Sequence, residues 1–421
     1  MVGEWINVPL GDVVTLQRGF DLPAQNRKPG KVPIVSSSGI SDYHSEVGVA
    51  GPGVVTGRYG TIGQVFLIRE NYWPLNTTLW VKDFHGNDPQ FASYLLRTVD
   101  FHSCSDKSSV PGVNRNDLHR IPVLLPPLAE QKAIAQILGA LDDKIELNRC
   151  MNATLEAMAR ALFQSWFVDF DPVRAKLDGR QPAGLDADTA ALFPAHFQDS
   201  PLGHIPQGWD VRSVEELAEQ VAMGPFGSSI KVSTFVSEGI PVISGQHLRG
   251  TMLDDSEFNF VTEEHAQQLK RCNVKRGDVI FTHAGSIGQV AYIPDTSRYE
   301  RYIVSQRQFY MRCKRAVMSP YYITSYFKTP EGQHRLLANT SSTGVPSISQ
   351  PVTYLRQLKI LVPPPELLKA FDSTVVLIHQ KIGRNDHESR TLATLRDSLL
   401  PKLLSGEISV AAFGSKLEVV T

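Results

Sequence analysis

Two glycine-rich loops with polar tips are the segments of this sequence best suited to contacting a nucleic acid. The first reads Gly57-Arg58-Tyr59-Gly60-Thr-Ile-Gly63, and the second reads His283-Ala284-Gly285-Ser-Ile-Gly288. Glycine permits a tight turn and a close approach of the backbone to a phosphate. Arg58 has the geometry to donate two hydrogen bonds to a guanine edge. A shared scaffold with different tips would give each loop its own preference, although a simple hairpin turn would explain the glycines alone.

Serine, glutamine, histidine and lysine side chains in other predicted loops are also suited to base edges and phosphates. Arg301 and Arg307 belong to a basic stretch between residues 297 and 315 in which aromatic residues lie among the arginines. That pattern suits phosphate contact, but a strand with one solvated basic face would produce it as well. The candidate DNA-contacting residues are Ser36, Ser37, Ser38, Tyr43, His44, Arg58, Tyr59, Ser228, Ser229, Lys231, Gln246, His247, His283, Arg301 and Arg307.

Motifs for catalysis and cofactor binding are missing from the sequence. It contains no Gly-x4-Gly-Lys-Ser/Thr loop for ATP and no dinucleotide-binding Gly-x-Gly-x-x-Gly that opens a helix. It has no His-Glu-x-x-His, and its 12 histidines show no metal-ligand spacing. The 4 cysteines are scattered, which fits a reducing cytoplasm rather than a disulfide framework or a zinc site. We therefore predict a non-catalytic chain with no cofactor or metal of its own.

The chain contains an internal repeat. Residues 118–167 align with residues 355–404 at a constant offset of 237, without a gap, and 12 of the 50 positions are identical. Roughly three identities would be expected from average composition. Upstream, the two glycine loops correspond, and Val110-Pro111-Gly-Val113 corresponds to Val345-Pro346-Ser-Ile348. The protein is therefore predicted to be two copies of one unit, each a globular part followed by a long helix.

Heptad spacing of apolar residues predicts these two helices. A lone helix with an apolar stripe must bury it, and antiparallel pairing of the two helices is favoured because the connector can then stay local. Asn148 and Asn385 are each the central member of five seam positions, so antiparallel helices would place them opposite each other. A buried Asn pair fixes register at some cost in stability. Each Asn could instead point to solvent.

The resulting fold prediction is an α+β protein with two related mixed α/β globular parts and two long helices in an antiparallel coiled coil. Internal duplication would relate the halves by a pseudo-two-fold axis, which suits a split site on double-stranded DNA. Short Val/Ile/Phe-rich runs predict the strands of the globular parts. The predicted segments are 1–125 (globular), 126–168 (helix), 169–204 (connector), 205–362 (globular), 363–408 (helix) and 409–421 (tail).

The net charge of −1 and the pI of about 6.9 argue against a protein that coats nucleic acid by bulk charge. Divided by segment, residues 1–125 sum to 0, 126–204 to −4, 205–360 to +3 and 361–421 to 0. The balance thus separates into a mildly basic second globular part, a neutral first one and an acidic helix with its connector. No apolar run approaches the ~20 residues that cross a bilayer, and the N-terminus lacks a secretory pattern. We expect no membrane association and a cytoplasmic location.

Several motifs resemble those of specificity subunits of type I restriction–modification systems. The helical matches are specific and the globular ones looser, and together they cover nearly the whole chain. They are Leu124-Leu-Pro-Pro-Leu-Ala-Glu-Gln-Lys132, Ile137-Leu-Gly-Ala-Leu-Asp-Asp-Lys-Ile145-Glu-Leu-Asn148, Phe163-Gln-Ser-Trp-Phe-Val-Asp-Phe170, Gly203-His-Ile-Pro-Gln-Gly-Trp209, Leu395-Arg-Asp-Ser-Leu-Leu-Pro-Lys-Leu-Leu-Ser-Gly-Glu-Ile408, Gly224-Pro-Phe-Gly-Ser-Ser-Ile-Lys231 and Trp73-Pro-Leu-Asn-Thr-Thr-Leu79.

The resemblance implies that the globular parts are target-recognition domains, each binding half of a split DNA sequence. The helices would act as a ruler and as a platform for two DNA methyltransferase (modification) subunits, which two restriction or translocase subunits could join. S-adenosylmethionine, ATP and Mg²⁺ would be held by those partners, and adenine would be methylated after base flipping. Two other classes stay open: a self-contained methyltransferase or nuclease with an unrecognised site, and a coiled-coil adaptor that does not read DNA.

Overall fold

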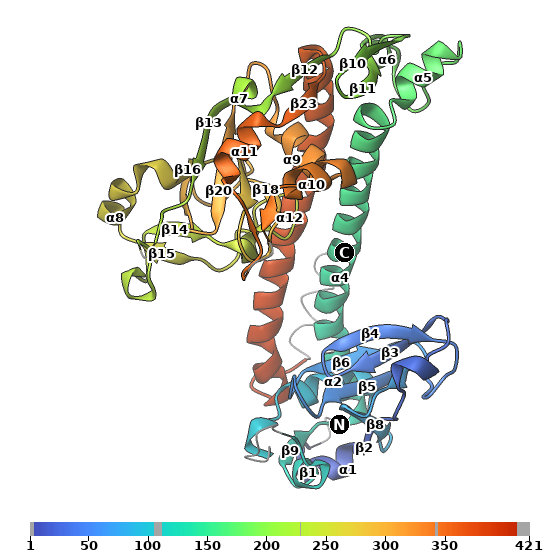
Figure 1. Ribbon diagram of the computed structural model, residues 1–421. Helices are drawn as coiled ribbons and strands as arrows, with labels where there is room; N and C mark the ends of the chain where they lie inside the picture. The colour runs from blue at the N-terminus through green and yellow to red at the C-terminus, as the bar shows by residue number, and fades with distance from the viewer. Residues whose placement is uncertain (1–3, 105–111, 228, 342–343, 411–421) are drawn as a thin grey trace. The chain divides into compact units, whose positions relative to one another are not determined.

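The computed structural model (Figure 1) describes residues 4–104, 112–227, 229–341 and 344–410, and it divides into two compact units. Unit 1 consists of residues 1–148 and 387–421, and unit 2 consists of residues 149–386. Each unit therefore combines one globular body with one half of each long helix. Within the described residues, no helix is both long and apolar enough to cross a membrane.

The globular body of unit 1 is built from two small sheets. A four-stranded antiparallel sheet has the order β2 (Thr15–Arg18), β8 (Thr78–Asp83), β5 (Gly53–Gly57), β6 (Val65–Ile68). A three-stranded sheet has the order β4 (Gly39–His44), β3 (Val32–Ser36), β7 (Trp73–Pro74), with β3 and β7 parallel. A separate antiparallel pair joins β1 (Ile6–Pro9) to β9 (Pro122–Leu125), and the helices are α1 (Leu10–Val13), α2 (Pro89–Arg97) and α3 (Arg115–Leu118).

The globular body of unit 2 repeats this plan. Its antiparallel sheet has the order β13 (Ala218–Met223), β20 (Gln308–Cys313), β17 (Asp278–Thr282), β18 (Val290–Tyr292). Its second sheet has the order β15 (Asn259–Val261), β14 (Ile240–Ile243), β19 (Arg301–Val304), β16 (Asn273–Lys275), with β14 and β19 parallel. The equivalent pair is β12 (Asp210–Ser213) with β23 (Lys359–Val362), and the equivalent helices are α7 (Val214–Leu217), α9 (Pro320–Lys328) and α11 (Pro351–Gln357). The shared strand order confirms the predicted duplication and the mixed α/β class.

Unit 2 also carries elements that have no counterpart among the described residues of unit 1, which leave out residues 105–111. They are the helices α8 (Glu263–Gln268) and α10 (Pro330–Leu337) and the two-stranded pair β21 (Thr340–Ser341) with β22 (Ser347–Ile348). The connector between the two bodies is ordered: it contains α5 (Asp171–Leu177), α6 (Ala187–Ala191) and the antiparallel pair β10 (Phe197–Ser200) with β11 (Gly203–Pro206). Trp166 packs edge-on against Phe193 of the connector at 5.3 Å between ring centroids.

The two long helices, α4 (Leu128–Phe167) and α12 (Pro365–Leu404), have 40 residues each. In unit 1, Asp142 of α4 pairs with Arg396 of α12 at 2.6 Å, and Asn148 contacts Glu388 at 2.9 Å. In unit 2, Asn152 contacts Asn385 at 2.8 Å, and the ring centroids of Phe163 and Phe371 are 5.8 Å apart. Residue numbers rise along α4 as they fall along α12, so the helix halves are antiparallel within each unit, as predicted.

Asn148 and Asn385 are buried at 0% and 1% exposure, as a seam position requires. Each donates its side-chain amide to the opposite long helix within its own unit. Their pairing with each other stays a prediction.

Candidate nucleic-acid interface

The two glycine loops are anchored by the same backbone hydrogen bonds in both units. In unit 1, Arg58 N donates to Thr77 O at 2.9 Å, and Val113 N donates to Arg58 O at 3.1 Å. In unit 2, His283 N donates to Arg307 O at 2.9 Å, and Ile348 N donates to His283 O at 2.8 Å. We call the three segments so joined the loop edge. It comprises residues 57–60, 75–77 and 112–113 in unit 1, and residues 282–285, 305–307 and 346–348 in unit 2.

Positive φ angles explain why glycine recurs in these loops. Gly60 and Gly63 have φ of 76° and 80°, and Gly285 and Gly288 have φ of 81° and 84°. Other residues rarely adopt this region. The tips differ: Arg58 and Tyr59 in unit 1 take the places of His283 and Ala284 in unit 2, so one scaffold presents different chemistry in each unit.

A basic groove adjoins the loop edge of unit 1. An open depression of about 460 Å³ is lined by Arg18, Arg58, Tyr59, Leu79, Gly112, Val113, Asn114 and Arg115. Arg18 and Arg115 also line a neighbouring depression of about 670 Å³, together with Thr15, Leu16, Gln17, Gly19, Lys82, Asn116 and His119. We call the two together the basic groove. Neither lining contains a carboxylate, so the basic groove is suited to a phosphate backbone.

The cationic side chains of the basic groove interact only weakly with other residues of the protein. Arg18 pairs with Asp21 at 3.0 Å, but both side chains are more than half exposed. Arg58 lies over the Tyr59 ring at 4.6 Å from its centroid. In the part of the chain that the structure describes, Arg58, Lys82 and Arg115 take part in no ion pair. These side chains can therefore turn toward an anionic ligand at little cost.

The predicted serine turn lies beside this edge, but its residues do not all face it. A Cβ on Gly60 would lie 3.5 Å from Ser37 Oγ, which places Ser37 next to the loop tip. Ser36 Oγ is engaged with Ser38 Oγ at 3.1 Å and donates to Gly39 O at 3.0 Å. Tyr43 is half exposed on β4, four residues beyond that turn.

His44 does not present its ring to a ligand. It is buried, its Nδ1 accepts from Lys28 N at 3.0 Å, and its ring meets Trp73 edge-on at 5.3 Å. Its position is that of a residue supporting the β3–β4 hairpin rather than one contacting DNA.

In unit 2 the loop edge brings His283 and Arg307 together. His283 Nε2 donates to Gln306 O at 3.1 Å, and burial lowers the pKa of this imidazole. A Cβ on Gly285 would lie 3.4 Å from Arg307 Nη1, so the guanidinium lies over the glycine loop. A neutral imidazole and an exposed arginine therefore form the tip of this edge.

Of the two neighbours Gln246 and His247, only Gln246 is exposed. His247 is buried, its Nδ1 accepts from Ser244 N at 2.9 Å, and its Nε2 donates to Glu257 O at 2.9 Å. It also stacks on Phe258 at 4.3 Å between ring centroids. His247 therefore supports its loop, while Gln246 is free of the core.

The loop after β13 carries three further candidates. Lys231 is exposed, and Ser229 Oγ donates to Phe226 O at 2.9 Å. Ser228 lies outside the described residues.

The basic stretch of residues 297–315 is not a continuous DNA-facing surface. Tyr302, Phe309 and Tyr310 are buried in the core. Arg312 pairs with the buried carboxylate of Asp278 at 2.6 Å. Arg301 pairs with Glu263 at the end of β19 opposite Arg307. Of the two arginines in this stretch that are predicted as contacts, only Arg307 lies at the loop edge.

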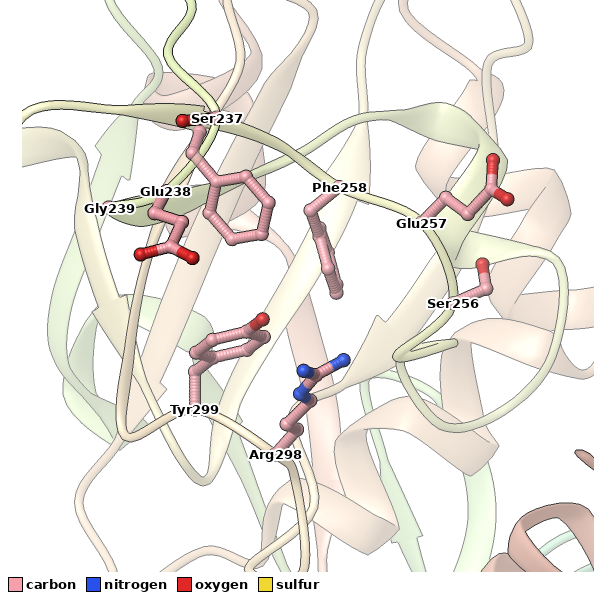
Figure 2. Close-up of a pocket in the computed structure, with 9 residues that line it drawn as sticks. Ser237, Glu238, Gly239, Ser256, Glu257, Phe258, Arg298 and Tyr299 are labelled. Atoms are coloured by element: carbon pink, nitrogen blue, oxygen red, sulfur yellow. The ribbon is translucent and has the colours of Figure 1, made fainter. Parts of the chain in front are cut away.

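An aromatic pocket lies at the end of β19 away from the loop edge (Figure 2). It encloses about 750 Å³, and its rings include Phe258 and Tyr299, whose centroids are 6.0 Å apart. Arg298 lies 5.2 Å from the Tyr299 centroid. The carboxylates of Glu238 and Glu257 line it as well. Two carboxylates repel phosphate, so this pocket does not extend the interface.

Sequence reasoning missed Arg18, Lys82 and Arg115. They come from β2, from β8 and from the start of α3, segments that are far apart in the chain. The one local signal is Asn114, whose Oδ1 accepts from Asn116 N at 3.0 Å and so caps the helix that presents Arg115.

The chain is similar to known proteins of one family. The family model described as "Type I restriction modification DNA specificity domain" matches residues 3–157 and 206–383. The HindI type I restriction enzyme specificity subunit of Haemophilus influenzae is 24% identical over 372 residues, which cover 76% of this chain and 77% of that protein. The MjaIX specificity subunit of Methanocaldococcus jannaschii is 22% identical over 355 residues, covering 80% and 74%.

The same fold occurs in a solved structure. The crystal structure of a type I restriction–modification system S subunit from M. genitalium matches with a TM-score of 0.60 at 16% identity, covering 95% of this chain and 96% of the other. Since the family model covers both repeats and more than half of the 421 residues, the chain belongs to the type I restriction–modification DNA specificity family.

Proposed function

We propose that this specificity subunit reads a split target in double-stranded DNA, one half with the loop edge of each unit. The observation that carries the proposal is the conserved backbone scaffold with unlike tips. The same two hydrogen bonds hold Arg58 in unit 1 and His283 in unit 2. Two copies of one scaffold with different side chains suit two half-sites of different sequence.

The side chains at each loop edge fit two separate tasks, phosphate contact and base recognition. In unit 1 the basic groove supplies phosphate contacts, which position a duplex without selecting a sequence. Arg58 projects from the adjoining loop, where a guanidinium can donate to a guanine edge. In unit 2 His283, Arg307, Gln246 and Lys231 offer donors and acceptors of another kind.

The partners follow from the family. We propose that two DNA methyltransferase subunits bind the helices and hold S-adenosylmethionine, and that two restriction or translocase subunits using ATP and Mg²⁺ could join them. The chain itself would be a non-catalytic recognition subunit working in the cytoplasm. Its near-neutral charge supports a reader that shares the DNA grip with those partners.

An exchange of loop tips tests the proposal. The chain is co-expressed with its modification subunits, and methylated bases are mapped across the host genome. Arg58→His with Tyr59→Ala should change one half of the target, and His283→Arg with Ala284→Tyr should change the other half. A change in both halves from one exchange, or in neither from both, would overturn the assignment.

Two control measurements address the other function classes. Methylation of DNA by the isolated chain with S-adenosylmethionine would identify a self-contained enzyme. An assembled complex that binds target and unrelated DNA equally at every salt concentration would identify an adaptor.

A further inference from the structure

One glycine in each unit, Gly19 in unit 1 and Gly224 in unit 2, holds the same backbone position beside the loop edge. Gly19 N donates to Thr78 O at 3.1 Å, and Gly224 N donates to Gln308 O at 2.8 Å. A Cβ on Gly19 would lie 2.2 Å from Leu75 O, and one on Gly224 would lie 2.0 Å from Ser305 O. Only glycine fits so close to another backbone. The chain that follows each glycine therefore starts from the loop edge.

An aromatic residue follows each of these glycines, but only one of the two is packed. Phe20 comes directly after Gly19, and its ring lies 5.8 Å from the Trp73 ring and 6.0 Å from the Trp80 ring. Phe226 follows Gly224 after one proline and is 79% exposed. Within the described residues its ring contacts no other aromatic ring. Unit 2 thus leaves in solvent a side chain of the type that unit 1 packs inside.

Polar and cationic residues flank the segment that carries Phe226. Phe226 lies two residues beyond Gly224, which is hydrogen-bonded to Gln308 beside Arg307. Lys231 follows in the same loop. A Cβ on Gly245, the neighbour of Gln246, would lie 3.8 Å from Gln308 Nε2. An exposed ring on a segment flanked by cations matches the layers of a duplex, in which an apolar base stack lies inside two rows of phosphates.

We propose that Phe226 is an apolar wedge of the second recognition unit, which enters the base stack at one step of its half-site and kinks the duplex there. The proposal rests on the proposed DNA-reading function and adds indirect readout to it. A step that unstacks easily is favoured over a stiff one, so the wedge selects sequence without a hydrogen bond to a base. Unit 1 has no equivalent wedge at this position, because Phe20 is packed against Trp73 and Trp80.

The test uses the complete complex of this chain with its modification subunits. Target duplexes carry 2-aminopurine at successive positions of both half-sites, because its fluorescence rises on unstacking. Apart from positions unstacked by base flipping at the modification subunits, which Phe226 substitutions should leave unchanged, the wild-type complex should brighten one position in the half-site read by unit 2. Phe226→Ala should abolish that signal and weaken target binding roughly tenfold or more, whereas Phe226→Trp should keep both. Leu177→Ala, which removes a residue 53% exposed on the connector helix α5, should behave as wild type.

Each other outcome is informative. Normal fluorescence and affinity with Phe226→Ala would overturn the wedge and leave DNA reading intact. Loss of modification subunits from the Phe226→Ala complex, with unstacking unchanged in the complexes that remain, would overturn it in favour of a protein contact. A wild-type complex that binds target no better than unrelated DNA would remove the proposed function and the wedge together.

Discussion

The side-chain amide of Asn385 on α12 donates a hydrogen bond of 2.8 Å to Asn152 Oδ1 on α4. In the other unit Asn148 Nδ2 donates to Ser389 Oγ at 3.3 Å. Asn148 and Asn385 are separated by the repeat offset of 237, and so are Asn152 and Ser389. The duplication has therefore kept a buried polar contact between the helices in both copies, where apolar residues would pack without setting a register.

The first prediction concerns this contact. Asn148→Leu and Asn385→Leu, made together, should leave the thermal unfolding temperature unchanged or raise it, because a buried polar seam residue sets register at a cost in stability. Instead, the register of α4 against α12 should become less strictly fixed. Targets whose spacer between the two half-sites is one base pair longer or shorter should then also become methylated. Lys381→Leu adds the same side chain at an exposed position of α12 and is the control. Unaltered spacing selectivity in the double variant would contradict the prediction.

The second prediction concerns Asp142, which joins three elements of unit 1. Its Oδ2 accepts from Tyr94 Oη at 2.7 Å and from Arg97 Nη1 at 3.1 Å, and its Oδ1 accepts from Arg396 Nη1 at 2.6 Å. Burial opposes ionisation here, but hydrogen bonds from Arg396 and Tyr94 outweigh it and lower the pKa of Asp142. Asp142→Asn should lower the free energy of unfolding by about 2 kcal/mol, since in this largely buried site Arg97 loses its carboxylate partner and Arg396 keeps only that of Asp397.

The neighbouring carboxylate provides the control for Asp142. Asp143 pairs with Arg69, but both side chains are more than half exposed, so Asp143→Asn should change the free energy of unfolding by less than about 1 kcal/mol. Denaturant titrations of both variants at pH 7 measure the difference. Because the lowered pKa means that stability is lost as the pH falls through it, the gap between the variants should narrow in acid. Equal stabilities at pH 7 would show that Asp142 does not hold the body to the helices.

Much of the fold could be predicted because its signals are local or repeated. The heptad pattern predicts α4 and α12, and the offset of 237 predicts that one body repeats the other. The glycine loops were also recognisable, because the positive φ at Gly60 and Gly285 favours glycine, which is visible in the sequence. Each of these features depends on residues close together in the chain or on comparison of its two halves.

The interface was harder to predict because tertiary packing determines which side chains turn inward and which lie at the surface. His247 lies in a polar loop, yet it turns inward to stack on Phe258. Arg312 turns to Asp278, a partner 34 residues away. Arg18 and Arg115 meet in one groove only because β2 and α3 fold together. No spacing rule along the sequence reports such contacts.

The third prediction concerns the basic groove. Arg115→Ala should weaken binding of the assembled complex to target and unrelated DNA alike, and it should reduce the slope of log affinity against log salt by about 1. The reason is that Arg115 lies in a groove without carboxylates, where we expect it to contact a phosphate and not a base. Arg120→Ala is the control, since Arg120 is exposed but pairs with Asp117 at 3.5 Å and lines neither depression. A loss confined to the target sequence would mean that Arg115 reads bases.

The fourth prediction concerns two titratable groups on α12 in unit 2. His379 is 5% exposed, its Nδ1 is hydrogen-bonded to Tyr292 Oη at 2.6 Å, and burial lowers its pKa to about 4. Burial raises the pKa of Asp372 to about 6, although Ser319 Oγ donates to it at 2.6 Å. Their effects on folding oppose each other as the pH falls.

The signs follow from proton binding. Between pH 6.5 and 4 the unfolded state protonates the histidine while folded His379 stays neutral, so up to about 3 kcal/mol of stability is lost across that window. Folded Asp372 takes up its proton near pH 6, before the unfolded state does, so its contribution rises over the same range. Wild-type stability should therefore change little from pH 6.5 to 4. In Asp372→Asn the free energy of unfolding should fall steeply as the pH falls from 6.5 to 4. Adding His379→Leu to that variant should make the free energy of unfolding nearly independent of pH again. Denaturant titrations across this range measure the three slopes, and an Asp372→Asn profile as shallow as wild type would refute the assignment.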